Sequence, residues 1–238
     1  DGESVCNDVV NDECTASGTC TTCYTFTQAD IDHIKSQGFN SIRLGVAWTG
    51  AQPAKENESQ LDADFVERLH KILDLTDKND LHVILDNHGD MVTSLGCGNG
   101  VPVWIAQEAA SDLIGKPLET AFPFSLVSSL NVEKVAGYDH CGNNETMWNQ
   151  HAGDINYNLL NECCLAMNSP NPGGLGYTKI AQKTMNYILK EGSPGKRSFI
   201  NYWRLIAKEV VNHPSAIALE LMNEPMTIQR REAYDTWK

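Results

Sequence analysis

Residues Ala216-Ile-Ala-Leu-Glu-Leu-Met-Asn-Glu-Pro225 decide the fold of this chain. An apolar run of this kind is typical of a strand that is buried on both faces, as in a parallel sheet. Pro225 has no amide hydrogen to give to a sheet, so the strand is predicted to end at Glu224. An acidic side chain then lies at the carboxyl end of a buried parallel strand, where barrel enzymes keep their catalytic groups. Taken alone, the segment fits a solvated loop glutamate equally well.

Helical and extended patterns alternate along the rest of the chain. Apolar spacing and capping residues predict helices over 27–38, 62–79 and 198–212. Further strands are predicted over 39–48 and 81–86. This alternation predicts a parallel sheet with helical crossovers.

A long stretch, residues 105–197, interrupts the alternation after the strand at 81–86 and has only a short helical pattern near 177–189. An insertion at this point follows the carboxyl end of a strand, so it should lie over the catalytic face and shape a binding cleft. Another helix is expected to begin near Gln229. Because the chain begins at Asp1 and ends within that helix, we expect it to be a piece of a longer protein.

Charge and composition exclude several classes of partner. The net charge of -13 argues against nucleic acid or an anionic membrane surface as the main partner. No apolar run approaches the ~20 residues that a membrane-spanning helix needs. With 41% hydrophobic and 21% charged residues, the composition is that of an ordinary globular protein.

The cysteines indicate an oxidising compartment. The chain has eight: Cys6, Cys14, Cys20, Cys23, Cys97, Cys141, Cys163 and Cys164. Glycosylation sequons at 57–59 and 144–146 agree with a secreted or lumenal location. A zinc site built on Cys20 and Cys23 is the competing interpretation, but no second close Cys or His pair follows at ligand spacing. We therefore expect disulfides and no metal.

Each predicted strand has polar residues near its carboxyl end. In a parallel barrel these ends lie together at one end of the barrel. We expect the following side chains to converge there: Arg43 and Trp48; Asp86, His88 and Asp90; Asn223 and Glu224. A buried structural ion pair for Arg43 and a satisfied loop histidine for His88 are the structural alternatives.

These residues carry a resemblance to a known family. Ser41-Ile-Arg43-Leu, His88 and Asn223-Glu224-Pro225 together resemble glycoside hydrolase family 5, the cellulase-type retaining glycosidases, from about residue 27 to the C-terminus. The stretches 45–53 and 88–104 are similar to its endoglycoceramidase branch. The chain departs from that branch at Gly89, where Gln is usual, and at Asn99, where Glu is common.

The resemblance implies an α/β fold, the (β/α)8 TIM barrel. The chain would cover roughly the first half, with a long insertion after the third barrel strand. Residues 1–26 would form a Cys-rich N-terminal extension, and residues 27–238 the barrel half with its insertion at 105–197.

The resemblance also assigns roles to the site residues. Glu224 is implied as the general acid/base, and Asn223 as the residue that holds the sugar 2-hydroxyl. Arg43 would orient carboxylates, while His88 and Asp90 would bind sugar hydroxyls. Two tryptophans, Trp48 and Trp104, would stack on sugar faces or else pack in the core.

The resemblance implies that the nucleophile comes from a seventh strand, which would lie beyond Lys238. No other glutamate here is expected at a comparable strand end. This chain alone would then be inactive. No metal or organic cofactor is needed for the mechanism.

We therefore expect a secreted retaining β-glycosidase that acts on a carbohydrate or glycolipid, either a glycosphingolipid or a β-glucan. Membrane contact would arise only through a lipid-linked substrate. A catalytically incomplete barrel that binds carbohydrate or glycolipid is the alternative. A disulfide-rich adhesion module would explain neither the buried strands nor the Asn-Glu-Pro turn.

Overall fold

The computed structural model describes residues 26–90, 92–114, 116–134 and 172–225. The chain divides into two compact units, residues 1–40 and 41–238. Most of the predicted Cys-rich extension and the predicted helix near Gln229 lie outside the described residues, so the boundaries proposed for the extension and the insertion stay predictions.

The first unit contains α1 (Gln28–Ser36), which confirms the helix predicted over 27–38. The side chain of Asp30 accepts hydrogen bonds from the amide and the hydroxyl of Thr27, both at 2.7 Å, and so closes the N-terminus. Gly38 ends the helix with φ of +84°, a conformation that glycine adopts without strain.

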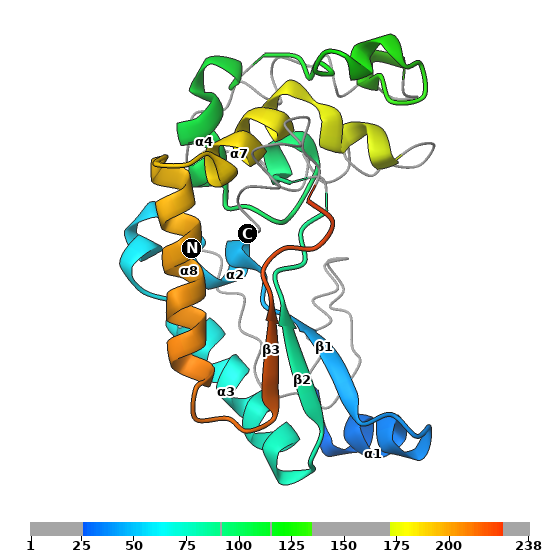
Figure 1. Ribbon diagram of the computed structural model, residues 1–238, viewed down its shortest axis with the longest axis vertical. Coiled ribbons are helices and arrows are strands. Elements are labelled where there is room, and N and C mark those ends of the chain that lie inside the picture. Colours follow the sequence, from blue (N-terminus) through cyan, green and yellow to red (C-terminus); the bar gives the residue numbers. More distant parts are fainter. Residues whose placement is uncertain (1–25, 91, 115, 135–171, 226–238) are drawn as a thin grey trace, which may run out of the picture. The chain divides into compact units, whose positions relative to one another are not determined.

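The second unit is built on a parallel sheet of three strands in the order β1 (Ser41–Gly45), β2 (His82–Asp86) and β3 (Ala216–Glu220) (Figure 1). Gly45 pairs with Asp86, and Asp86 with Glu220, so the last residues of all three strands lie side by side. The prediction of a parallel sheet with helical crossovers is confirmed.

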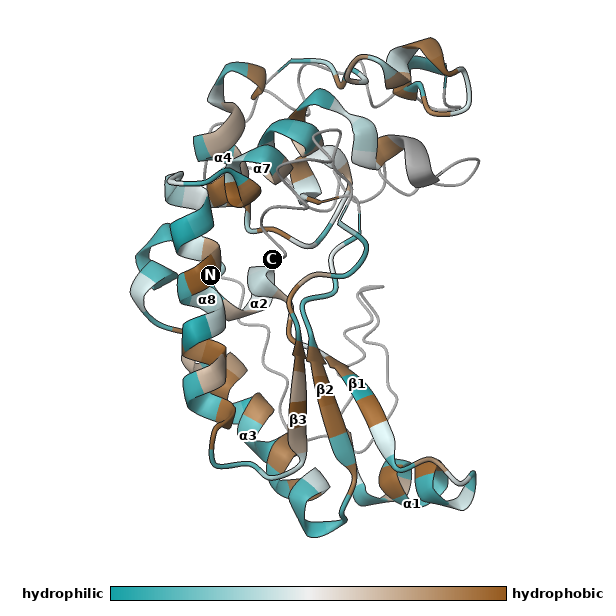
Figure 2. Cartoon of the chain, viewed as in Figure 1, coloured by the Kyte–Doolittle hydropathy of each residue, from teal (hydrophilic) through white to brown (hydrophobic). Residues whose placement is uncertain are grey.

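Two long helices, α3 (Ala63–Lys78) and α8 (Pro194–Val210), supply the crossovers. Their caps follow from sequence: the Asp62 side chain accepts from the amide of Phe65, and Ser193 from that of Lys196. The strands are mostly hydrophobic, whereas the helices alternate between hydrophobic and hydrophilic positions (Figure 2). Side chains from both kinds of element form the core: Leu69, Leu73, Val83, Leu85, Tyr202 and Ile206.

The predicted strand over 216–224 is wrong in its end and in its burial. It ends at Glu220. The amide of Asn87 still donates to the Glu220 carbonyl, but the Asn87 carbonyl then accepts from the amide of Asn223 at 3.2 Å, one residue out of the regular parallel register. Within the described sheet β3 pairs only with β2, and its side chains are not buried on both faces. Ile217 is 56% exposed, and Leu219 is 37% exposed.

The strand predicted over 39–48 is also shorter than expected, because Trp48 begins a short helix, α2 (Trp48–Ala51). A 3-10 helix, η1 (Lys55–Ser59), follows it. The first of the two sequons falls in η1, and the second lies outside the described residues.

The described part of the insertion contains more regular structure than its sequence indicates. Helix α7 (Lys179–Leu189) confirms the helical pattern predicted near 177–189. It packs against α4 (Val103–Ala110), which begins just before the insertion, beyond the carboxyl ends of the strands (Figure 1). Short 3-10 helices complete the loops: η2 (Ser94–Gly96), η3 (Ser111–Leu113), η4 (Phe124–Leu126), η5 (Val132–Lys134) and η7 (Pro172–Tyr177).

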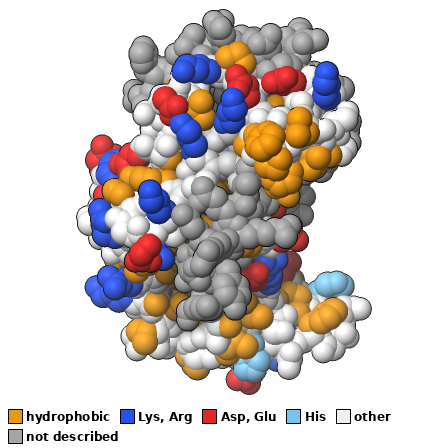
Figure 3. Space-filling model, turned by 45° about the horizontal axis from the view of Figure 1, so that its top comes forward, with side chains coloured by type: hydrophobic (Ala, Val, Ile, Leu, Met, Phe, Trp, Pro, Cys, Tyr) orange, Lys and Arg blue, Asp and Glu red, His pale blue; other side chains and the backbone are white. Residues whose placement is uncertain are grey.

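The surface is mixed in character. Figure 3 shows hydrophobic side chains gathered in a patch on the visible face, with acidic and basic side chains nearby. The large exposed hydrophobic side chains of the insertion are Phe122, Leu126 and Val127. No helix in the described parts of the chain is both long and apolar enough to cross a membrane.

Candidate active site

Arg43 lies at the centre of a polar network at the carboxyl ends of the strands. Its Nε and Nη2 donate to the two carboxylate oxygens of Glu220 at 2.7 and 2.6 Å. Nη2 also reaches Asp86 Oδ2 at 3.1 Å and Asn223 Oδ1 at 2.9 Å. The hydrogen bond with Glu220 raises the pKa of Arg43 and lowers the pKa of Glu220, so both groups stay charged.

The structural alternative for Arg43 was a buried ion pair. In the structure Asp86 is the buried partner of that pair, and Arg43 is not buried. The Arg43 side chain is 39% exposed, whereas that of Asp86 is 2% exposed. Arg43 therefore pairs with a buried acid on one side and faces the open mouth of the site on the other.

His88 joins the same network through Asp86. Its Nδ1 lies 2.8 Å from Asp86 Oδ2, and its Nε2 lies 3.5 Å from Asn223 Nδ2. Asn223 Nδ2 also donates to Asp90 Oδ1 at 3.4 Å. The amide of Asn223 is thus oriented: its oxygen faces Arg43, and its nitrogen faces His88 and Asp90.

Glu224 follows Asn223 directly and is exposed to solvent. Its φ of +36° is unusual for a residue other than glycine and marks a constrained turn. Its charge contributes to the raised pKa of Arg43, after the larger effects of Glu220 and Asp86, so the Glu224 carboxylate lies within electrostatic reach of the network.

The structure therefore brings together the predicted residues Arg43, His88, Asp90 and Asn223, with Glu224 beside them. It separates the two tryptophans from them. Trp48 is fully buried and Trp104 is 7% exposed, and their rings meet edge to face at 6.3 Å. Sugar stacking needs an exposed ring face, so these contacts support core packing.

Glu220 is the residue that sequence reasoning missed. The expectation that no other glutamate lies at a comparable strand end is wrong, because Glu220 is the last residue of β3. The strand was predicted to end just before Pro225, at Glu224, which is four residues beyond its observed end.

Asn87 was missed as well, although its place directly after β2 is a signal. Its side-chain oxygen accepts from the amide of Trp48 at 3.1 Å, and its carbonyl accepts from the amide of Asn223 at 3.2 Å. It ties the segments after all three strands together.

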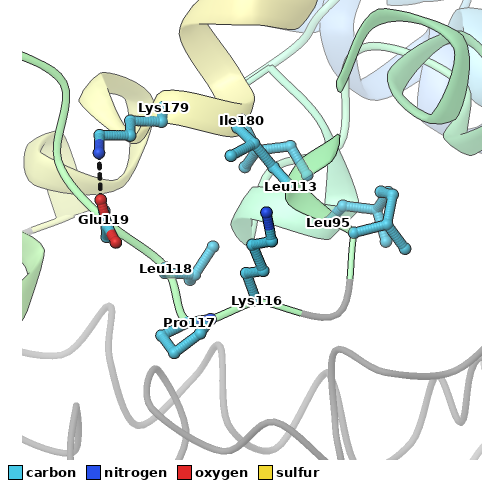
Figure 4. A pocket seen from close by; sticks show the side chains of 9 residues that line it. Leu95, Leu113, Lys116, Pro117, Leu118, Glu119, Lys179 and Ile180 are labelled. Atoms are coloured by element: carbon cyan, nitrogen blue, oxygen red, sulfur yellow. Dashed lines mark hydrogen bonds and ion pairs between the residues drawn. The ribbon is translucent and has the colours of Figure 1, made fainter. Parts of the chain in front are cut away.

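A second concave region lies inside the insertion (Figure 4). It is largely apolar, and Lys179 at its edge pairs with Glu119. Its lining consists of Leu95, Leu113, Ile114, Lys116, Pro117, Leu118, Glu119, Lys179 and Ile180. None of these residues belongs to the network around Arg43, so the two features are separate.

The chain also has one cluster with the donor atoms of a cation site among the described residues, formed by Asp74, Asp77 and His213. It lies near the amino end of β3, at the opposite end of the strand from Arg43. Asp77 accepts from the amide of Ser215 at 2.8 Å and pairs with His213 at 2.7 Å, so these groups already satisfy one another. The cluster ties α3 to the start of β3.

Comparison with known proteins identifies the family. Residues 7–163, more than half of the chain, match the family model of cellulase, glycosyl hydrolase family 5. The matched range contains Arg43, His88 and Asp90 but neither Asn223 nor Glu224.

Two curated relatives are similar to the chain. Endoglycoceramidase I of Rhodococcus hoagii (strain 103S) is 33% identical over 121 residues, which are 50% of this chain and 23% of that protein. An endoglycoceramidase of Hydra vulgaris is 24% identical over 202 residues, 84% of this chain and 32% of that protein. The chain therefore spans about a quarter to a third of the length of these relatives.

The fold has a solved counterpart in endo-glycoceramidase II from Rhodococcus sp., in complex with a five-membered iminocyclitol. The TM-score is 0.57 at 15% identity, with 89% of this chain and 39% of that chain covered. At this identity the likeness establishes the fold alone, and the three parallel strands with their crossovers are part of a (β/α)8 barrel. From the family model and this fold together, the chain belongs to glycosyl hydrolase family 5.

Proposed function

We propose that the protein is a retaining β-glycosidase in which Glu224 is the general acid/base. One observation carries the proposal: Arg43 holds the oxygen of Asn223, which directs the Asn223 amide nitrogen toward His88 and Asp90, and Glu224 follows in a constrained turn. A sugar ring bound there would meet hydrogen-bonding groups on one side and a carboxyl group beside them.

In this mechanism Glu224 gives its proton to the glycosidic oxygen and later takes a proton from the attacking water. Asn223 donates its amide hydrogen to the sugar 2-hydroxyl, because its oxygen is occupied by Arg43. A second carboxylate about 5–5.5 Å from the acid/base attacks the sugar. The family resemblance assigns this nucleophile to a later strand that this chain does not contain, so we expect residues 1–238 alone to be inactive.

We propose a glycosphingolipid as the substrate in preference to a β-glucan. The similar proteins are named endoglycoceramidases, and the 33% identity to one of them supports this choice. We further propose a secreted or lumenal location, which the disulfide at Cys97 and the sequon in η1 support. The membrane would be met only through the lipid-linked substrate.

The acid/base role is tested by Glu224→Ala in the full-length protein. Without the proton donor, hydrolysis of a glycolipid should fall by about 10²–10⁴-fold. An aryl glycoside with an activated leaving group needs little protonation, so its glycosylation step should lose far less. Both rates are measured against Glu67→Ala, which removes an exposed carboxylate from α3 and should change neither.

If Glu224→Ala lowered the hydrolysis rates of both substrates equally, Glu224 would not be the acid/base. A wild-type protein that binds the glycolipid but hydrolyses neither substrate would instead favour the alternative, a barrel that only binds carbohydrate or glycolipid.

A further inference from the structure

The turn that carries Asp90 is tied to a second loop, residues 97–101, by a pair of hydrogen bonds. The amide of Asp90 donates to the side-chain oxygen Oδ1 of Asn99 at 2.8 Å, and the amide of Asn99 donates back to the carbonyl of Asp90 at 2.9 Å. Two residues further, the amide of Val101 donates to the carbonyl of Val92 at 2.7 Å. The two segments therefore run side by side.

This contact requires glycine on both sides. A Cβ atom placed on Gly89 would lie 2.5 Å from the Cα of Gly100, and a Cβ on Gly100 would lie 2.5 Å from the Cα of Gly89. Because the obstructing atoms belong to the backbone, no side-chain movement could relieve the clash. Gly89 directly precedes Asp90, and Gly100 directly follows Asn99, so this close approach adjoins the hydrogen-bonded pair.

The contact matters because, among the described residues, the Asp90 side chain has only long contacts. Its side chain is 52% exposed and reaches Asn223 Nδ2 at 3.4 Å and His88 Nε2 at 3.6 Å, both long distances. The main-chain position of Asp90 then decides where its carboxylate lies, and Asn99 holds that main chain. On its other side, the Asn99 carbonyl accepts from Thr49 Oγ1 at 3.2 Å.

Asn99 also borders an open groove. The groove is lined by Thr49, Pro53, Ser94, Gly98, Asn99, Pro102 and Val103. The residue that fixes Asp90 therefore faces both the polar network and the groove, where a further part of a substrate could lie.

We propose that Asn99 is a positioning residue for Asp90 and thereby sets the affinity of the site for sugars. The inference rests on the proposed function, since it assumes that Asp90 binds a sugar hydroxyl. The Asn99 side chain and the Gly89–Gly100 contact set the distance between the two loops, and so set how closely a sugar can approach Asp90.

The test uses the full-length protein with Asn99→Ala, Asn99→Asp and Gly89→Gln. Affinity for lactose and cellobiose is measured by calorimetry with Glu224→Gln as the common background, which stops turnover. Loss of one well-formed hydrogen bond should weaken the affinity by about 5- to 15-fold in Asn99→Ala. Asn99→Asp keeps an acceptor for the Asp90 amide and should restore most of the affinity, whereas Gly89→Gln should weaken it.

Two further readouts separate positioning from a structural role. With Glu224 intact, Asn99→Ala should raise KM more than it lowers kcat. Hydrogen exchange at the Asp90 amide should become faster in Asn99→Ala and return toward the wild-type rate in Asn99→Asp. The control is Asn131→Ala, in the insertion, which removes a similar bond to the amide of Glu133 and a second bond to the carbonyl of Ser125, and should leave sugar affinity unchanged.

Faster exchange at Asp90 with unchanged sugar affinity would overturn the proposal, as would equal losses of affinity in Asn99→Ala and Asn131→Ala. If the wild-type protein bound neither sugar, the proposed function would fail, and the role of Asn99 in sugar affinity would fail with it. The exchange measurement would still report whether Asn99 holds the Asp90 turn.

Discussion

At the scale of single residues, the guanidinium of Arg43 connects strands that are far apart in sequence. It binds Glu220 through two nitrogens, while its Nη2 also contacts Asp86 and Asn223. Glu220 therefore has a definite consequence: it fixes the plane of the guanidinium, and that plane decides which way the Asn223 amide faces.

We predict that Glu220→Gln lowers kcat/KM of the full-length protein by about tenfold, because a neutral amide cannot replace both charge-assisted hydrogen bonds. The pKa of Glu220 lies below its ordinary value of 4.5, so the bidentate pair is complete above that value and is lost as the pH falls through the lower folded value. The acid limb of the wild-type pH–rate profile should therefore contain a component that Glu220→Gln lacks. Identical acid limbs in the two proteins would contradict this role.

Sequence reasoning found five members of this network for a simple reason. They lie near or just after the carboxyl ends of strands, and parallel strands bring those ends together: Arg43, Asp86, His88, Asp90 and Asn223. Glu220 could not be found in the same way, because the strand end had been inferred from Pro225. The strand actually ends where its pairing slips by one residue, at the bond from the Asn223 amide to the Asn87 carbonyl, a tertiary contact that no local pattern reveals.

At the scale of secondary-structure elements, the alternation of helices and strands was predictable because apolar periodicity records which face each element buries. In the insertion only the helix near 177–189 was predictable, and α7 confirms it. The second cluster of buried residues joins positions distant in sequence, such as Leu95, Val132 and Ile180, so it leaves no periodic signal. Burial of β3 was overestimated because an apolar run does not reveal which of its faces another element covers.

At the junction of α7 and α8, we predict that replacing a helical glycine by alanine destabilises the protein, the opposite of the usual effect. Gly195 lies in the first turn of α8, and a Cβ there would approach Tyr187 Cδ1 to 2.4 Å and the Tyr187 carbonyl oxygen to 2.8 Å. Alanine is the better helix former by about 1 kcal/mol. We nevertheless expect Gly195→Ala to lower the free energy of unfolding by about 1–3 kcal/mol, because the two helices must separate.

Urea denaturation of the full-length protein measures this change. Gly50 in α2 is the matched control, since a Cβ there would meet only Phe65 Cδ2 at 4.0 Å. Gly50→Ala should be neutral or stabilising. If Gly195→Ala were equally harmless, the close packing of the two helices would be disproved.

At the scale of the whole molecule, the exposed apolar side chains of β3 and of the residue that follows it are the main liability of residues 1–238. In β3, Ile217 is 56% and Leu219 is 37% exposed, and Leu221 after it is 40% exposed. Within the described sheet one edge of β3 has no partner strand, and such edges pair with other chains.

We therefore predict that residues 1–238, produced alone, associate in a concentration-dependent manner and that Ile217→Lys reduces this association. A charge on the edge strand opposes intermolecular pairing. Sedimentation should show the apparent mass of the variant moving toward the monomer value of 26.3 kDa. Val211→Lys, at an exposed apolar position outside the strand, should have no such effect, and an equal effect would point to general hydrophobic attraction.

The buried indole of Trp48 also makes the barrel core visible to spectroscopy. Its ring stacks on that of Tyr202, with the two centroids 5.5 Å apart, and meets the ring of Trp104 edge to face. Its Nε1 donates a hydrogen bond to Gln52 Oε1 at 2.7 Å. An indole fixed in such an asymmetric aromatic setting gives a near-ultraviolet circular dichroism band and an emission that iodide cannot quench. Both signals disappear when the aromatic packing loosens, so the chain carries its own optical reporter of tertiary order.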